Sequence, residues 1–169
     1  VMDEVREQAE RDYQLASGLS QDVETDDNVF RQTTARLPWL LIGMLGGIGN
    51  SMILGNFDST FAAHPEMALY IPLIGGTGGN VGTQSSALVV QGLANSSLNA
   101  ENTFKQVLKE SVVALINATI ISMLVYIYNF IRFGATATVS YSVSISLFAV
   151  VMFASIFGTL VPMTLEKLK

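Results

Sequence analysis

The sequence predicts an all-α protein, a polytopic membrane helix bundle of four transmembrane helices preceded by an N-terminal cytoplasmic helix. Half of its 169 residues are apolar and only 14% are charged, whereas soluble domains carry about a quarter charged residues. Four stretches contain no Asp, Glu, Lys or Arg: residues 37–57, 67–100, 111–131 and 133–165. A helix that crosses a bilayer needs about 20 mostly apolar residues, so each stretch can hold one span.

Basic residues indicate how these spans are oriented, because cytoplasmic loops carry an excess of Lys and Arg. Four arginines precede the first stretch. The loop after the first stretch contains no basic residue, and the loop after the third contains only Arg132. Lys105 and Lys109 follow the second stretch, and Lys167 and Lys169 follow the fourth. The sequence therefore predicts a multi-pass protein of the cell (inner) membrane with a cytoplasmic N-terminus and both chain ends inside.

Residues 1–34 are expected to form a cytoplasmic acidic connecting helix and linker. Residues 1–27 hold nine of the 14 acidic residues, and Met2, Val5, Ala9 and Tyr13 recur at helical spacing. Because the chain begins at Val1 and ends directly after an apolar stretch, we expect it to be cut from a longer protein. Residues 35–169 are then a transmembrane domain.

Three of the uncharged stretches are typical of scaffold helices. The first span, near residues 38–57, carries Gly43 and Gly47, a spacing that lets a neighbouring helix approach closely. The third span, near residues 111–131, is rich in Ile, Val and Leu, and the fourth, near 139–165, is rich in Ser at its start. Their Ser and Asn side chains are expected to form hydrogen bonds between helices.

The second stretch is unusual because residues 75–84 read GGTGGNVGTQ, with five glycines in ten residues. Each glycine costs about 1 kcal/mol of helix propensity relative to Ala. We therefore expect a helix that is broken, or one that is tightly packed and locally unwound. Irregular backbone at membrane depth survives only where it is buried in protein or lines a water-filled cavity.

Several kinds of chemistry are excluded by the residues that are missing. The chain has no Cys, and its one His, His64, lies in a predicted outer loop, so a zinc site and a nucleophile–base pair cannot be assembled. A phosphate-binding loop needs a Lys after its glycines, and residues 75–84 have none. An enzyme and a nucleic-acid partner are therefore not expected.

Oxygen ligands remain. They are supplied by any carbonyls that leave helical geometry and by the side chains of Thr77, Asn80, Thr83, Gln84, Ser85 and Ser86. Hard cations take oxygen ligands, and Mg²⁺ usually keeps several waters, so a neutral site suits a partly hydrated Mg²⁺. The composition is equally consistent with two interpretations. Residues 75–84 either hold a cation, or their glycines only permit close packing of helices. Glu110, at the predicted cytoplasmic edge of the third span, marks either an ion path or an ordinary interfacial charge.

Residues 72–94, PLIGGTGGNVGTQSSALVVQGLA, resemble the membrane domain of the MgtE family of Mg²⁺ transporters. The shared pattern is a Pro, an apolar pair, Gly-Thr-Gly-Gly-Asn, a further Gly and Gln-Ser. Leu108-Lys109-Glu110 and Arg36-x-x-Trp39-Leu40 support the resemblance. The family commonly has Asn where this chain has Thr83.

The resemblance implies a homodimer in membrane lipid, with a Mg²⁺ pore along the dimer axis and five spans per subunit, the fifth lying beyond this chain. The residues implied to line the ion path are Thr77, Gly78, Gly79, Asn80, Thr83 and Gln84. Asn80 and Glu110 are the implied metal contacts. Glu7, Glu10 and Asp12 form a possible regulatory cation site, so Mg²⁺ is both the transported ion and a possible regulatory ligand.

Two other functions stay open from the residues themselves. A secondary transporter for a small anionic substrate places helix N-termini at the substrate and predicts an inverted repeat, but a second Gly-rich break does not occur in the sequence. A non-transporting membrane scaffold predicts that residues 75–84 are dry and packed against helices.

Overall fold

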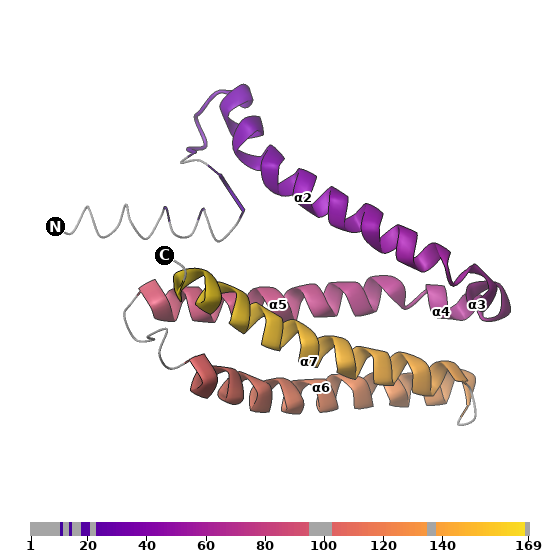
Figure 1. Cartoon of the computed structure of the whole chain (residues 1–169). Helices are drawn as coiled ribbons and strands as arrows, with labels where there is room; N and C mark the ends of the chain where they lie inside the picture. Colours follow the sequence, from indigo (N-terminus) through magenta and orange to yellow (C-terminus); the bar gives the residue numbers. More distant parts are fainter. Residues whose placement is uncertain are drawn as a thin grey trace. The chain divides into compact units, whose positions relative to one another are not determined.

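The computed structural model describes residues 11, 14, 18–20, 23–94, 103–134 and 138–167, and these residues form helices, turns and short links. The helices are α2 (Val29–Gly55), α3 (Asp58–Ala63), α4 (Pro65–Ala68), α5 (Ile71–Ala94), α6 (Thr103–Phe133) and α7 (Thr138–Lys167) (Figure 1). The chain divides into two compact units, Val1–Ser59 and Thr60–Lys169. Each unit is described by itself.

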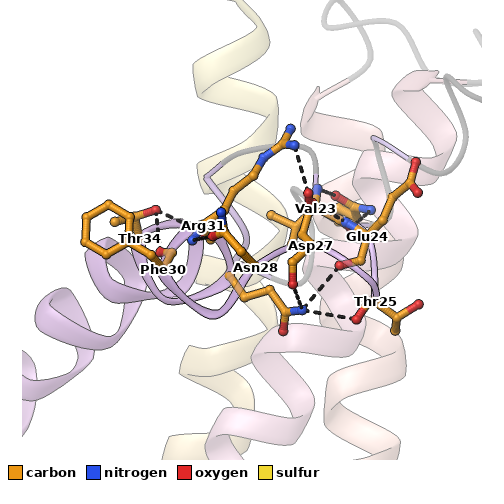
Figure 2. A network of polar contacts seen from close by, with 10 residues as sticks. Val23, Glu24, Thr25, Asp27, Asn28, Phe30, Arg31 and Thr34 are labelled. Atoms are coloured by element: carbon orange, nitrogen blue, oxygen red, sulfur yellow. Dashed lines mark hydrogen bonds and ion pairs between the residues drawn. The ribbon is translucent and has the colours of Figure 1, made fainter.

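In the first unit, a network of polar contacts determines where α2 begins (Figure 2). The side chain of Asn28 accepts a hydrogen bond from the backbone N–H of Arg31 at 2.8 Å, which caps the helix. Asp27 accepts a bond from Arg31 Nη1 at 2.9 Å, and Gln32 Nε2 donates to the Asp27 carbonyl at 2.9 Å. The predicted first span, residues 38–57, lies almost wholly in this helix, which starts earlier because of this cap.

Three helices of the described residues are long and apolar enough to cross a membrane. They are α2, residues 104–133 of α6, and α7, with mean hydropathy of 1.5, 2.0 and 2.2. The 24 residues of α5 also suffice in length, but its Gly, Thr, Asn and Gln residues make it less apolar. Three of the four predicted spans are therefore found, and the fourth stays a prediction.

In the second unit, α7 packs against both α5 and α6 (Figure 1). Its buried residues recur at intervals of three or four, which places them on one side of the helix. They are Val139, Ser140, Val143, Ser144, Leu147, Val151, Ser155, Thr159 and Met163. In the middle of the bundle, Leu147 and Val151 pack against Ala118 of α6 and Val81 of α5. This side of α7 is the core of the unit.

A second buried contact joins the start of α5 to the end of α6. The hydroxyl of Tyr70 donates a hydrogen bond to Oδ1 of Asn129, and both side chains are buried. Tyr70 also packs against Val139 and Val143 of α7. The Nδ2 atom of Asn129 is buried without a hydrogen-bond partner among the described residues, so the bond from Tyr70 is the main polar contact of this amide.

Replacing Tyr70 with Phe is expected to lower the free energy of unfolding by about 1–2 kcal/mol, because it leaves the buried carbonyl oxygen of Asn129 without a partner. The measurement is reversible unfolding of the full-length protein in detergent micelles. Tyr128→Phe is the matched control, since Tyr128 is 59% exposed and should lose little. Equal effects of the two substitutions would show that the Tyr70 hydroxyl contributes nothing specific.

The predicted break in the second stretch is wrong. Helix α5 runs without interruption from Ile71 to Ala94, so its backbone groups stay in the helical hydrogen-bond ladder. An unpaired backbone group in the bilayer core costs several kcal/mol, more than the roughly 1 kcal/mol that each glycine costs in helix propensity. The carbonyls of residues 75–82 are therefore not freed as ligands. The local unwinding that was expected as the alternative is also absent from this helix, and only the tight packing expected with it is found.

The acidic N-terminal segment lies largely outside the described residues. Glu7, Glu10 and Asp12, the possible regulatory cation site, all fall there. Their role stays a prediction.

Candidate functional site

Helix α5 presents two chemically different faces. One face is buried in the unit and carries small or apolar residues: Gly78, Ser85 and Val89 are buried and Gly82 is partly buried. Their spacing of four, three and four residues keeps them on one side of a helix. This face packs against α7.

The two backbones approach most closely where Gly82 of α5 faces Gly158 of α7. A Cβ atom added to Gly158 would lie 2.5 Å from the carbonyl oxygen of Gly82. One helical turn away along α5, a Cβ atom on Gly78 would lie 2.6 Å from Cγ1 of Val150. Small residues at such contacts let membrane helices pack backbone to backbone. Two of the five glycines in residues 75–84 are thus explained by packing alone.

The other face of α5 is polar and is left uncovered by the described helices of the second unit. Asn80, Thr83 and Gln84 are exposed and Thr77 is partly exposed. Residues three and four apart are neighbours on a helix, so these four side chains form one continuous group, which we call the polar face. Gly79 is exposed beside them and has open space where a Cβ would stand.

The structure therefore brings together five of the six residues predicted to line an ion path. The sixth, Gly78, is buried on the opposite face against Val150. Carbonyl and hydroxyl oxygens on the polar face can accept hydrogen bonds from the waters of a hydrated cation. A neutral group of this kind can hold such an ion weakly, which permits release.

Glu110 lies elsewhere, at a junction of three helices. Its Oε2 atom is 3.3 Å from Oγ of Ser85 in α5 and 3.4 Å from Oγ of Ser155 in α7. The two hydroxyl oxygens are 3.0 Å apart. The three side chains are only 7%, 5% and 2% exposed, respectively. We call these three residues the buried carboxylate cluster.

The hydroxyl contacts of Glu110 are thus with Ser85 on the buried face of α5 and with Ser155 of α7, whereas Asn80 belongs to the polar face. Ser85 and Asn80 are five residues apart, and five residues turn a helix by about 140°. The two residues predicted to contact metal are therefore not brought into one site within this chain. Among the described residues, no salt-bridge contact of Glu110 with Lys, Arg or His is found.

Sequence reasoning missed Ser155 and Gly158 as individual residues. Ser155 belonged only to the general expectation that serines of the fourth span bond between helices. The available signal was the small-residue spacing Ala154-x-x-x-Gly158, which is typical of a close helix contact. That spacing does not reveal which helix is the partner.

Comparison with known proteins identifies the relatives of this chain. Residues 71–169, more than half of it, match the MgtE family model, described as a divalent cation transporter. The chain is 34% identical over 134 residues to the magnesium transporter MgtE of Thermus thermophilus, covering 79% of the chain and 29% of the relative.

It is also 28% identical over 169 residues to the magnesium transporter MgtE of Bacillus subtilis, covering 100% of the chain and 37% of the relative. The magnesium transporter MgtE of Enterococcus faecalis is 26% identical over 168 residues, which cover 99% of the chain and 37% of that relative. The chain thus spans well under half the length of these relatives.

Proposed function

Because the chain belongs to the MgtE family of divalent cation transporters, we propose that the full-length protein carries Mg²⁺ across the membrane and that the polar face of α5 lines the ion's path. The observation that carries this proposal is the continuous polar face, Thr77, Asn80, Thr83 and Gln84. The described helices of the second unit leave it uncovered, while the other face of α5 is packed. An uncovered polar face costs free energy in lipid. Water or a second subunit on that face removes the cost.

The proposed path forms where two copies of the chain face each other across a homodimer axis. Mg²⁺ loses its inner waters reluctantly, so it passes α5 partly hydrated. Amide and hydroxyl oxygens of Asn80 and Thr83 then accept hydrogen bonds from those waters. A membrane potential of 100 mV acts on the double charge with about 4.6 kcal/mol, twice the single-charge value. Transport in this mechanism needs no nucleotide.

Orientation and location belong to the same proposal. The excess of basic residues at both ends of the chain supports a cytoplasmic N-terminus in a multi-pass protein of the cell (inner) membrane. Surrounding lipid and the second subunit are the proposed partners.

The packing of α5 bears on the scaffold alternative. Gly78 and Gly82 contact α7, so close helix packing accounts for these two residues. Packing among the described residues of the second unit does not account for Asn80, Thr83 and Gln84, which are exposed. A scaffold predicts that this face is dry, whereas an ion path predicts that it is wet, so the two functions differ in a measurable property.

Replacing Asn80 with Ala in the full-length protein is expected to lower the rate of Mg²⁺ uptake into liposomes about tenfold or more. This corresponds to the loss of about one hydrogen bond to a charged, hydrated ion in the rate-limiting state. A Mg²⁺-sensitive dye inside the liposomes reports the rate.

Asn117→Ala is the matched control, because Asn117 is also an exposed amide but lies on α6. Protein incorporated per liposome is measured for both variants. Uptake by the Asn80 variant at the rate of the control would remove Asn80 from the ion path, and absence of Mg²⁺ uptake by the unaltered protein would reject transport itself.

A further inference from the structure

The four tyrosines of the second unit gather at one end of its helix bundle. They are Tyr70, Tyr126, Tyr128 and Tyr141. Tyr70 lies directly before α5 and bonds to Asn129 of α6, and the ring centroids of Tyr126 and Tyr141 are 5.5 Å apart. This is the end where α6 finishes and α7 begins (Figure 1). Tyrosine is enriched where a membrane protein meets the lipid headgroups, so we expect this end of α6 at headgroup level.

Arg132 lies at the same end and carries an isolated charge. It is the only Asp, Glu, Lys or Arg between residues 111 and 165, and it is exposed in the last turn of α6. Its guanidinium carbon lies 5.6 Å from the centre of the Phe133 ring, which is an aromatic contact and not an anion. In the described part of the chain, no carboxylate lies at salt-bridge distance from Arg132, and Glu66 of α4 contacts His64 instead, at 3.2 Å.

Tyr128 is placed to act together with Arg132. The two residues are four apart in α6, so their side chains are neighbours on one side of the helix. Tyr128 is exposed, and its hydroxyl forms no hydrogen bond with another described residue. A guanidinium presents a planar fork of N–H donors that matches the oxygens of a phosphate, and a phenol adds one O–H donor. The pair therefore offers one positive charge and several donors to a single phosphate group.

Toward the middle of α6, this pair is followed by a row of exposed apolar side chains. In steps of four from Tyr128 these are Leu124, Ile120 and Ile116, each more than half exposed, and we call them the apolar ridge. Residues four apart form a continuous ridge on a helix surface. The distance along the helix from Ile116 to Tyr128 is about 18 Å, at a rise of about 1.5 Å per residue. One leaflet of the hydrocarbon core is about 15 Å thick, so the apolar ridge spans the depth of one leaflet.

The order of chemistry along this side of α6 is complementary to a phospholipid. The apolar ridge suits acyl chains, and the hydroxyl and the guanidinium beyond it suit a phosphate. The same residues favour one kind of headgroup. A zwitterionic headgroup also carries an ammonium or choline cation, which needs a carboxylate, and among the described residues at this end Glu66 already contacts His64. Charge complementarity therefore favours a headgroup with a net negative charge.

We propose that Tyr128 and Arg132 bind the phosphate group of an anionic phospholipid whose acyl chains lie along the apolar ridge of α6. The bound lipid supplies the anion that Arg132 lacks and fixes the depth of this end of α6 in the bilayer. The site requires that α6 crosses the membrane, but its occupancy depends neither on Mg²⁺ transport nor on the polar face of α5. The other candidate cover for this side of α6 is a helix from the rest of the full-length protein.

Binding is measured on the full-length protein in detergent, titrated with phosphatidylglycerol or with phosphatidylcholine, by native mass spectrometry of the retained lipids. We expect the unaltered protein to bind phosphatidylglycerol more tightly. Arg132→Gln should weaken that binding about tenfold, because charged hydrogen bonds to the phosphate are lost. Arg132→Lys keeps the charge without the planar fork, and Tyr128→Phe removes one donor, so each should weaken binding about threefold.

Other anionic-lipid sites also contribute to the retained lipid, so a double-mutant comparison isolates this one. Two groups that bind the same phosphate are energetically coupled, whereas distant groups act independently. Tyr128→Phe should therefore weaken phosphatidylglycerol binding less in the Arg132→Gln protein than in the Lys105→Gln protein. Lys105 is the matched control, because it is an exposed basic residue at the opposite end of the same helix and its loss changes the net charge equally.

Three results would overturn the site. The first is equal binding of phosphatidylglycerol by Arg132→Gln and by the unaltered protein, which would leave a protein helix as the cover of this side of α6. The second is an equal effect of Tyr128→Phe in the Arg132→Gln and Lys105→Gln proteins. The third is displacement of the Arg132-dependent lipid by inorganic phosphate at a matched concentration, which would assign a site for free phosphate instead. Mg²⁺ uptake does not enter any of these measurements, so failure of this site and failure of the proposed transport are distinguished.

Discussion

Replacing Gly158 with Ala is expected to destabilise the bundle by about 3 kcal/mol, the upper part of the range for overpacked cores. The added Cβ atom would lie 2.5 Å from the Gly82 carbonyl oxygen and 3.2 Å from Gly82 Cα. These are backbone atoms of α5, which cannot rotate away as a side chain can. The helices must therefore separate, and the buried carboxylate cluster three residues away on each helix is pulled apart with them.

Gly82→Ala is the matched control for this prediction, because it adds the same methyl group to the other side of the same contact. A Cβ atom on Gly82 would lie 3.6 Å from the Ala154 carbonyl oxygen, an ordinary van der Waals distance. We expect this variant to unfold within about 0.5 kcal/mol of the unaltered protein. Unfolding of both full-length variants in detergent measures the difference, and equal destabilisation would contradict a tighter backbone contact at Gly158 than at Gly82.

Replacing Leu147 with Ala is expected to lower the free energy of unfolding by about 2 kcal/mol. Leu147 is 0% exposed and packs with Ala118 and Val151 at the centre of the unit. Leu-to-Ala substitutions in cores cost about 2–5 kcal/mol, part of which is the cavity that remains. We expect the lower end here, because lipid is as apolar as the bundle interior and only the packing contribution is lost.

Ile145→Ala tests whether burial causes this effect. Ile145 lies two residues from Leu147 in α7 and is 67% exposed, so its truncation removes contacts with lipid rather than with helices. We expect a change below about 0.5 kcal/mol in the same unfolding measurement. A larger loss at Ile145 than at Leu147 would mean that the outward and inward faces of α7 are exchanged.

The positions of the long helices could be predicted from charge alone. The uncharged stretches at residues 111–131 and 133–165 lie within α6 (Thr103–Phe133) and α7 (Thr138–Lys167) apart from a short link. Helix α6 begins before its uncharged stretch because Lys105 and Lys109 are good helix formers and are exposed at its start. The ends of an uncharged stretch indicate which part of a helix can lie in lipid. They do not indicate where the helix itself begins or ends.

The continuity of α5 could not be predicted from propensity. The glycine content of residues 75–84 favours a break, and the expected break was wrong because propensity describes a chain in water, where a freed carbonyl is solvated. In the bundle, Gly78 and Gly82 lie against α7, and the gain from close packing is available only to an intact helix. The same glycines that weaken an isolated helix therefore strengthen this one.

The sequence by itself determined that the chain is helical and apolar over long stretches, which stretches these are, and, through residues 72–94, which family it belongs to. Only the tertiary structure decided which side of each helix faces inward. The carboxylate of Glu110 lies beside two serines that are 25 and 45 residues away in the chain, while Asn80 stays uncovered. In water, apolar periodicity reveals the inner face of a helix. In a membrane the lipid-facing side of a helix is apolar as well, so the inner face is chosen by shape and by a few polar contacts between residues far apart in the sequence.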